Sequence, residues 1–242
     1  MKRLQALIFN FDGTLADTAQ AWRNAFNLSF SDHGLPCWFD DSVSARRYFR
    51  SSRETEWIGR IGKRHMLDSP TIQSVLDRRD HHFNSMAESG LVPMRADTKS
   101  LIQRASAKGI RIGIATMAER APVMSVIEQS MGMQAVDTFA AIQCHSVGDA
   151  AKPDPQIYTN LIERLGVSPL DCVAVASSAS GMSSAYHAGI YTIGLKDRRK
   201  GVEPMQHSDM TIGSLTMTAG QLLAAAGGPK APPQVNELAA LL

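Results

Sequence analysis

From about residue 93 the chain alternates short apolar segments with helical ones, and this alternation restricts its fold more than any other feature. Buried strands are predicted over 4–9, 110–115, 139–143, 172–176 and 190–195. Helices are predicted over 98–108, 121–131, 155–165 and 180–187, each ending at or shortly before a glycine. Strands that alternate with helices form a parallel sheet through right-handed crossovers. The predicted fold class is therefore α/β, with a Rossmann-like parallel sheet.

The segment between the first and second predicted strands shows no strand-like alternation. Apolar residues recur there near helical spacing, as at Ala21, Ala25 and Leu28. Helix breaks are indicated at 34–36 and 68–70. We therefore predict an all-helical cap over residues 16–91, inserted into a core domain of residues 1–15 and 92–226.

Residues 227–242 follow the predicted core. Glycine and proline dominate 227–233, a composition typical of a linker, and the apolar residues of 235–242 predict a short helix. That helix would either dock on the core or contact another subunit.

Charge and cysteine content exclude several classes of protein. The 25 Lys and Arg residues against 23 Asp and Glu give a formal charge of +2, which provides no broad basic surface for nucleic acid. No apolar run approaches the roughly 18 residues that a membrane span needs. The three cysteines form no paired motif, so a reducing cytoplasm is the predicted location. A protein partner or a homo-oligomer stays open.

Polar side chains stand where the predicted strands end. Asn10 and Asp12 follow the first strand, Thr116 the second, Lys152 the third and Ser177 the fourth. Ligands of parallel α/β sheets bind beyond the carboxyl ends of the strands. We therefore expect these five side chains to face one site.

Four ordered segments around these residues carry a family pattern. They are Leu-Ile-Phe-Asn-Phe-Asp-Gly-Thr-Leu-Ala-Asp-Thr at 7–18, Ile-Gly-Ile-Ala-Thr at 112–116, Gly-Asp-Ala-Ala-Lys-Pro-Asp-Pro at 148–155, and the glycine helix at 180–190. Together they resemble the motifs of the haloacid dehalogenase-like (HAD) superfamily, in its β-phosphoglucomutase and phosphoglycolate phosphatase branch. The resemblance covers nearly the whole core and implies a HAD core with an inserted cap.

The resemblance also implies a chemistry for each position. In the family a first Asp attacks the phosphoryl group, and an Asp two residues later moves the leaving group's proton. A Thr and a Lys hold the phosphate oxygens. Mg²⁺ is bound by the first Asp, by an acid of the fourth motif and by the second Asp, mainly through its backbone carbonyl. The matching residues here are Asn10, Asp12, Thr116, Lys152 and Ser177.

Two of these positions depart from the family. Asn10 replaces the nucleophilic Asp, and an amide is a very poor nucleophile for phosphorus. Ala176 and Ser177 stand where the fourth motif has its acidic residue. Loss of both carboxylates predicts severely weakened Mg²⁺ binding, so Asp12 and Ser177 are degenerate metal positions and no cofactor is expected.

The phosphate-binding half of the pattern is retained in Thr116 and Lys152. Gly13 is expected to leave backbone N–H groups accessible to an anion. Asn10 removes a negative charge and so lowers the repulsion of a phosphate. We therefore predict a pseudoenzyme that keeps a pocket for phosphate or a phosphorylated small molecule.

Two alternatives stay open. One is an active Mg²⁺-dependent phosphatase or β-phosphoglucomutase-like enzyme with non-standard ligands. The other is a structural or regulatory protein with a vestigial pocket. Mg²⁺-dependent turnover separates the first alternative from the pseudoenzyme, and phosphate binding separates the second from it.

Arg53, within Ser-Arg-Glu at 52–54, resembles the family's cap arginine that grips the distal part of the substrate. Arg46, Arg47 and Arg50 lie with it at nearly one-face helical spacing. This spacing fits either a clamp for an anionic substrate or a solvated basic face.

A second polar cluster lies further along the predicted cap. His81 and His82 are close in sequence to Asp77 and Asp80. These residue types ligate metal ions when they converge, whereas adjacent histidines on a polar helix are commonly surface residues. Both interpretations stay open.

Overall fold

The computed structural model describes residues 4–36, 39, 52–146, 150–196, 206–216 and 232–241. Six strands form one parallel sheet in the order β3-β2-β1-β4-β5-β6, which confirms the predicted fold class. The strands are β1 (Ala6–Phe9), β2 (Arg111–Thr116), β3 (Phe139–Cys144), β4 (Cys172–Ala176), β5 (Tyr191–Leu195) and β6 (Met210–Ile212).

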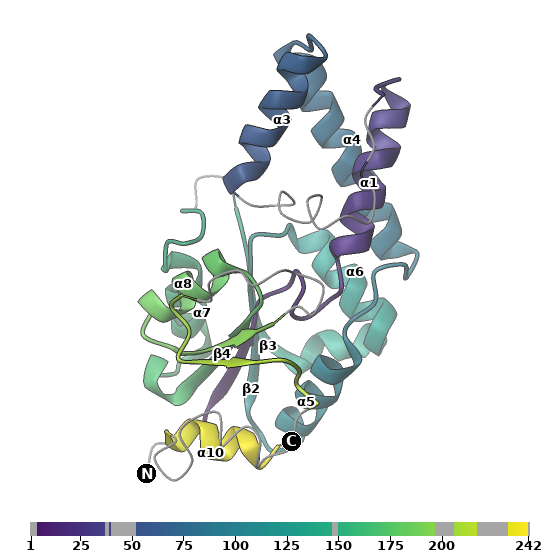
Figure 1. Cartoon of the computed structure of the whole chain (residues 1–242). Helices are drawn as coiled ribbons and strands as arrows, with labels where there is room; N and C mark the ends of the chain where they lie inside the picture. The colour runs from purple at the N-terminus through teal and green to yellow at the C-terminus, as the bar shows by residue number, and fades with distance from the viewer. Residues whose placement is uncertain are drawn as a thin grey trace.

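Helices follow or precede the strands along the chain (Figure 1). They are α1 (Ala19–Asp32), α3 (Ser52–Arg64), α4 (Ser69–Glu88), α5 (Ala96–Ala107), α6 (Arg120–Met131), α7 (Gln156–Leu165), α8 (Ala179–His187) and α10 (Pro233–Ala239), with short 3-10 helices η1 (Met133–Thr138) and η2 (Pro169–Asp171). Among the described residues no helix combines the length and apolar character that crossing a membrane requires.

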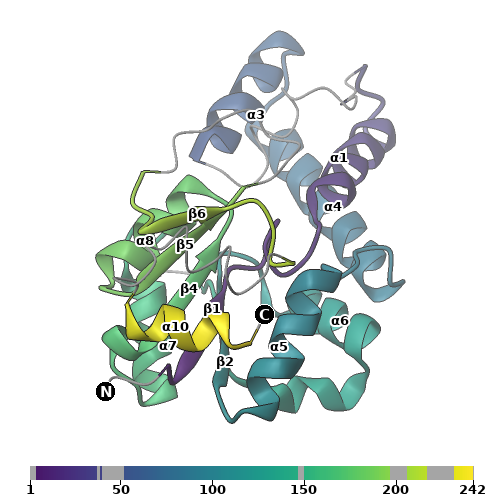
Figure 2. The same ribbon diagram turned by 60° about the horizontal axis from the view of Figure 1, so that its bottom comes forward.

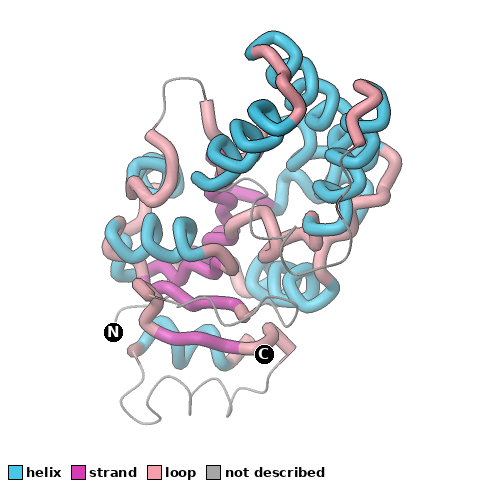
Figure 3. The backbone as a smooth tube through the Cα atoms, turned by 45° about the horizontal axis from the view of Figure 1, so that its top comes forward, coloured by secondary structure: helices cyan, strands magenta, loops and turns pink. Residues whose placement is uncertain are grey.

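The sheet lies between two layers of helices (Figure 3). Alternate residues of a strand point to opposite faces, and β1 follows this rule with four fully buried residues. Leu7 and Phe9 join the cluster that includes residues of α5, α6 and α10, whereas Ala6 and Ile8 join the cluster that includes α7 and α8. Burial on both faces explains why the strand reads as an unbroken apolar run.

The edge strand β6 is a feature that the sequence analysis missed. It is only three residues long and pairs in parallel with β5, with Ile193 opposite Met210 and Leu195 opposite Ile212. Its alternation of two apolar residues around one threonine is too short to distinguish from a loop.

Helices α1, α3 and α4 project from one end of the sheet (Figure 1). The base of this segment is joined to the core, because Trp22 of α1 stacks on Phe83 of α4 with ring centroids 3.7 Å apart and both belong to the main core cluster. Phe26, Phe30 and Val75 form a separate cluster further out. A cap spanning residues 16–91 stays a prediction.

The C-terminal helix α10 docks on the core (Figure 2). Its residues Val235 and Leu238 are buried, and the Glu237 carboxylate accepts a hydrogen bond from the Leu4 backbone N–H at 2.8 Å. Of the two predicted roles for this segment, the structure shows the docked one. Residues 227–231 of the predicted linker lie outside the described residues.

We expect Leu238→Ala to lower the free energy of unfolding by about 2–4 kcal/mol, because it removes a side chain that is 1% exposed. Leu170→Ala is the matched control, since Leu170 is 51% exposed and its truncation should change stability by less than about 0.5 kcal/mol. Urea unfolding of both variants measures the difference. Equal stabilities would show that α10 does not contribute to the core.

Candidate active site

The site begins where β1 ends. The Asn10 N–H donates to Val175 O at 3.0 Å and continues the ladder between β1 and β4. The chain then turns sharply, because the Leu15 N–H returns to Asn10 O at 3.1 Å and Gly13 takes a left-handed φ of +70°. This turn places Asn10 and Asp12 at the carboxyl edge of the sheet, as predicted, and Thr14 lies in the same turn.

Asn10 and Lys152 are in direct contact. The Lys152 Nζ donates to Asn10 Oδ1 at 3.0 Å and to Ala115 O at 2.8 Å, and it lies 5.0 Å from the centroid of the Tyr158 ring. Since the amide oxygen accepts from the ammonium, the Asn10 Nδ2 group is directed elsewhere. Within the described part of the chain, Nδ2 makes no hydrogen bond. It is also not one of the fully buried polar atoms that lack a partner.

Burial strongly affects the charge of Lys152. It lowers the pKa of the ammonium from 10.5 to about 7, although the negative charge of Asp12 acts in the opposite direction. A carboxylate at position 10 would pair with this ammonium, whereas the neutral amide of Asn10 supplies only a dipole. Lys152 therefore changes charge near neutral pH.

The Asp12 carboxylate faces the start of α1. Its Oδ1 accepts hydrogen bonds from Thr18 Oγ1 at 2.8 Å and from the Trp22 indole N–H at 3.0 Å. Sequence reasoning missed Trp22 as a site residue, because an apolar residue at helical spacing indicates core packing alone. Thr18 could have been identified from the sequence, because it is the last residue of the first motif.

Ser177 and Thr14 close the other side of the turn. The Ser177 hydroxyl donates to Asp12 O at 3.1 Å and accepts from Thr14 Oγ1 at 3.1 Å. Gly13 has to be glycine here, because a Cβ at this position would lie 2.8 Å from Ser177 Oγ. The two loops after β1 and β4 are thus held together by hydroxyl groups.

This arrangement does not suit a divalent cation. Mg²⁺ prefers carboxylate, carbonyl and water oxygens, but the Asp12 carbonyl accepts from Ser177, and Asn10 Oδ1 faces an ammonium. Over the described ranges no group of three or more His, Cys, Asp or Glu residues gathers to hold a metal ion. With Asn10 and Ser177 in the place of carboxylates, the donor set offers fewer charged oxygens than Mg²⁺ prefers.

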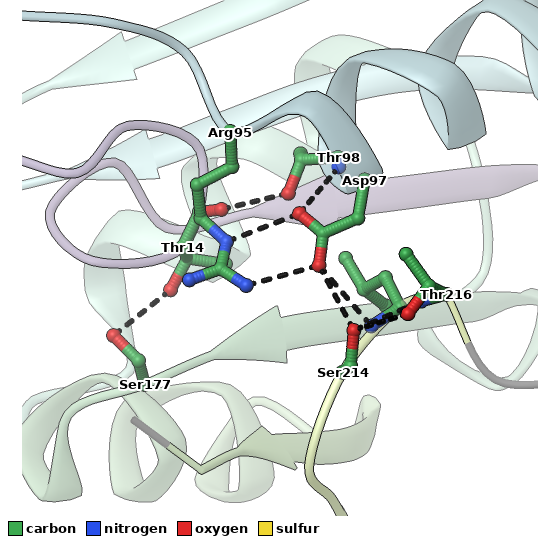
Figure 4. Close-up of polar contacts among 8 residues, drawn as sticks. Thr14, Arg95, Asp97, Thr98, Ser177, Ser214 and Thr216 are labelled. Carbon is green, nitrogen blue, oxygen red and sulfur yellow. Dashed lines mark hydrogen bonds and ion pairs between the residues drawn. The ribbon is translucent and has the colours of Figure 1, made fainter. Parts of the chain in front are cut away.

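A network behind the turn fixes Thr14 (Figure 4). Thr98 Oγ1 donates to Thr14 O at 2.8 Å, and Asp97 Oδ1 accepts from the Thr98 N–H at 2.9 Å. Arg95 and the Ser214–Leu215 segment also bind the Asp97 carboxylate. Burial raises the pKa of Asp97, but hydrogen bonds and charge from Arg95, helped by backbone N–H groups, outweigh it and hold the pKa below its ordinary value.

The N–H groups of Gly13 and Thr14 form hydrogen bonds within the turn. The Gly13 N–H donates to Ala16 O at 2.8 Å and the Thr14 N–H donates to Phe11 O at 3.3 Å. An anion at this backbone would therefore have to share these donors. The anion-binding role of Gly13 stays a prediction.

Thr116 lies at the end of β2 as predicted, but its side chain is fully buried. Its Oγ1 accepts from the Ala118 N–H at 3.0 Å and so shapes the loop that follows β2. A direct contact between Thr116 and a phosphate stays a prediction.

The predicted cap residues are described only in part. Arg53 lies on α3, but its side chain is outside the described residues, as are Arg46, Arg47 and Arg50 entirely. Their role as a substrate clamp stays a prediction.

Comparison with known proteins places this geometry in context. Residues 7–195 match the model of a family described as haloacid dehalogenase-like hydrolase. The chain is 29% identical to protein CbbY of Rhodobacter capsulatus over 223 residues, which cover 91% of this chain and 97% of the relative. It is 26% identical to the β-phosphoglucomutase of Bacillus subtilis over 212 residues, covering 86% and 89% of the two chains.

Solved structures agree with the sequence comparison. The crystal structure of CbbY from Rhodobacter sphaeroides in complex with phosphate has a TM-score of 0.77 and 26% identity, and the match covers 93% of this chain and 98% of that one. An Asp-to-Asn variant of the same protein, in complex with xylulose-(1,5)bisphosphate, has a TM-score of 0.76 and 26% identity, covering 88% and 95%.

We expect Gly13→Ala to destabilise the protein by about 2–4 kcal/mol, because alanine is strained at positive φ and its Cβ would overlap Ser177 Oγ. Gly109→Ala is the matched control: Gly109 has φ +76° but nothing within 4 Å of a Cβ, so only the backbone strain of about 1 kcal/mol remains. Thermal unfolding compares the two. Equal losses of stability in the two variants would mean that Ser177 does not limit the space for a side chain at position 13.

Proposed function

This chain belongs to the haloacid dehalogenase-like hydrolase family, and we propose that it binds a phosphorylated small molecule without Mg²⁺-dependent phosphoryl transfer. The contact between Lys152 Nζ and Asn10 Oδ1 at 3.0 Å carries this proposal. The side chain at the nucleophile position is the neutral amide of Asn10, and its oxygen already accepts a hydrogen bond from the Lys152 ammonium.

The amide at position 10 favours anion binding. An aspartate there would present only acceptors and a negative charge to a phosphate, whereas Asn10 turns its Oδ1 to Lys152 and keeps two Nδ2 hydrogens for another acceptor. The Lys152 ammonium has three N–H donors, and within the described residues Asn10 and Ala115 accept two of them. Together the two side chains offer an oxyanion up to three hydrogen bonds.

The loss of catalysis is argued from the same atoms. Phosphoryl transfer through a covalent intermediate needs a nucleophile, and an amide oxygen paired with an ammonium is a poor one. The acid–base position is retained in Asp12, but its carboxylate is held by Thr18 and Trp22. Ala176 and Ser177 supply no negative charge for a metal ion, so the proposed function involves no metal-dependent step.

The relatives indicate the class of ligand. The Rhodobacter sphaeroides protein is bound to phosphate in one structure and, as an Asp-to-Asn variant, to xylulose-(1,5)bisphosphate in another. An asparagine in that protein is therefore compatible with a bound sugar bisphosphate. We propose a sugar phosphate or bisphosphate as the ligand here, with Arg53 of α3 as a candidate contact to its distal end.

Family membership favours one second candidate, an active Mg²⁺-dependent phosphatase or phosphomutase with unusual ligands. A vestigial pocket in a protein that acts through a partner is the third. For all three candidates we propose a reducing cytoplasm as the location, since the three cysteines of the sequence form no paired motif.

We expect no phosphate release by the wild type from a panel of sugar phosphates, sugar bisphosphates and phosphoglycolate with Mg²⁺. The double variant Asn10→Asp with Ser177→Asp restores the nucleophile and a metal carboxylate, and we expect measurable release from it. A colorimetric assay of inorganic phosphate measures both proteins.

Release by the wild type that Lys152→Met abolishes would contradict the proposal and support the active enzyme. A shared contaminating phosphatase is excluded if Lys99→Met behaves like the parent protein, since Lys99 binds Ser130 O away from the site.

We expect sulfate to bind more weakly as pH rises through about 7, because the pKa of Lys152 is lowered to about 7 and only the ammonium attracts the anion. Sulfate keeps its charge over this range, so the pH dependence reports the protein. Between pH 6 and pH 9 the affinity should fall about tenfold or more.

Calorimetry on three variants gives the controls. Lys152→Met should lose both affinity and pH dependence, and Lys99→Met should keep both. Asn10→Asp should weaken binding at pH 6 and move the loss to higher pH, because a carboxylate repels sulfate and stabilises the ammonium. Absence of sulfate, phosphate and sugar bisphosphate binding to the wild type would leave the vestigial pocket as the conclusion.

A further inference from the structure

Three aromatic side chains converge on the surface at the C-terminal end of α8. His187 ends α8, Tyr186 precedes it, and His207 lies in the turn before β6. The ring centroids of His187 and His207 are 5.0 Å apart, and Tyr186 lies 5.7 Å from His207 and 5.8 Å from His187. Nineteen residues of chain separate the two histidines, so the fold brings them together.

The hydrogen bonds of His187 set its protonation. Its Nδ1 lies 2.7 Å from Ser183 O, and a carbonyl oxygen can only accept, so Nδ1 carries the hydrogen. In the neutral ring Nε2 therefore keeps its lone pair. A backbone carbonyl behind the second ring nitrogen is the usual support of a metal-binding histidine.

His207 is exposed, and its backbone takes an uncommon conformation. Its φ is +63°, in the left-handed region, and the described residues give its ring no hydrogen bond, only the contacts with Tyr186 and His187. Two imidazole rings bound to one tetrahedral ion, with metal–nitrogen distances of about 2.0–2.1 Å, have centroids about 5 Å apart. The observed centroid separation of 5.0 Å, with the ring planes inclined by 47°, is within reach of that arrangement after rotation of the two exposed side chains.

We propose that His187 and His207 form an open binding site for a borderline divalent cation such as Zn²⁺. Neutral imidazole nitrogen is a preferred ligand of this class of ion. No third His, Cys, Asp or Glu of the described ranges completes the set, so water fills the remaining positions. The site is exposed and binds its ion reversibly.

A bound ion would connect two parts of the core. His187 belongs to α8, which follows β4 and the Ser177 loop, and His207 belongs to the turn that leads into β6. Asp209 of that turn already pairs with the backbone of Thr192 in β5. The ion would add a link between α8 and the edge of the sheet.

The other histidine pair lacks these features. His82 Nε2 lies 2.7 Å from an Asp32 oxygen that also accepts from Arg78. Asp77 accepts from Gln73, and Asp80 pairs with Arg79. The structure therefore answers the question left open for His81 and His82 in favour of surface residues, and the pair provides a control.

The test is calorimetric titration of the whole chain with ZnCl₂ alone, and with NiCl₂ as a second probe. We expect one site in the wild type that EDTA reverses. His187→Gln keeps the helix, and His207→Asn suits a left-handed backbone, so both variants should fold. Each should weaken binding by about tenfold or more, and His81→Gln should leave it unchanged.

Chemical mapping locates the site without any variant. Diethylpyrocarbonate modifies free imidazole nitrogens, and mass spectrometry reads each of the seven histidines separately. Zn²⁺ should protect His187 and His207 and leave His81 reactive. Protection elsewhere, unchanged affinity in His187→Gln, or no Zn²⁺ binding by the wild type would each overturn the proposal.

Discussion

The hydrogen bond between Lys152 and Asn10 is the interaction on which the site depends. A buried ammonium is costly unless a negative charge compensates for it. Here the nearest partners of Lys152 Nζ are two neutral oxygens, at 2.8 and 3.0 Å, and burial lowers the pKa of Lys152 to about 7. An anionic ligand would supply the missing charge. On the proposed function, ligand binding and proton uptake by Lys152 are therefore linked, and the charged lysine is the form that favours a bound anion.

The rest of the edge is built to hold this pair in place. Asn10 is fixed by the ladder to Val175, and the turn after it is fixed from two sides: Ser177 binds the Asp12 carbonyl, and Thr98 binds the Thr14 carbonyl. Asp97 stands behind Thr98 and reaches the segment that follows β6 (Figure 4). Hydroxyl groups thus replace charges at the loop junction.

Much of the core could be predicted from the sequence, because strands buried on both faces form apolar runs and polar residues mark their ends. The positions of Asn10, Asp12 and Lys152 followed from this rule. The bonds of Gly13 did not, because a tight turn consumes its own N–H groups. Trp22 and β6 were also missed. The Trp22 indole packs in the core and donates to the Asp12 carboxylate, but its sequence position indicates core packing alone. Strand β6 has three residues, too few to show a strand periodicity.

The same limits explain why sequence motifs alone give an ambiguous function. Lys152 and Thr116 match motif positions of a family of hydrolases. A motif identifies the residue type at a position but does not describe the surroundings of its side chain. The environment adds what the motif leaves out: Thr116 is buried and its Oγ1 accepts from the Ala118 N–H, and Lys152 faces an amide at position 10. A single oxygen-to-nitrogen exchange at position 10 replaces a carboxylate beside Lys152 with a neutral amide and adds two N–H donors. On the proposed function, this change acts together with the uncharged Ala176 and Ser177 to disfavour phosphoryl transfer and to favour retention of an anion.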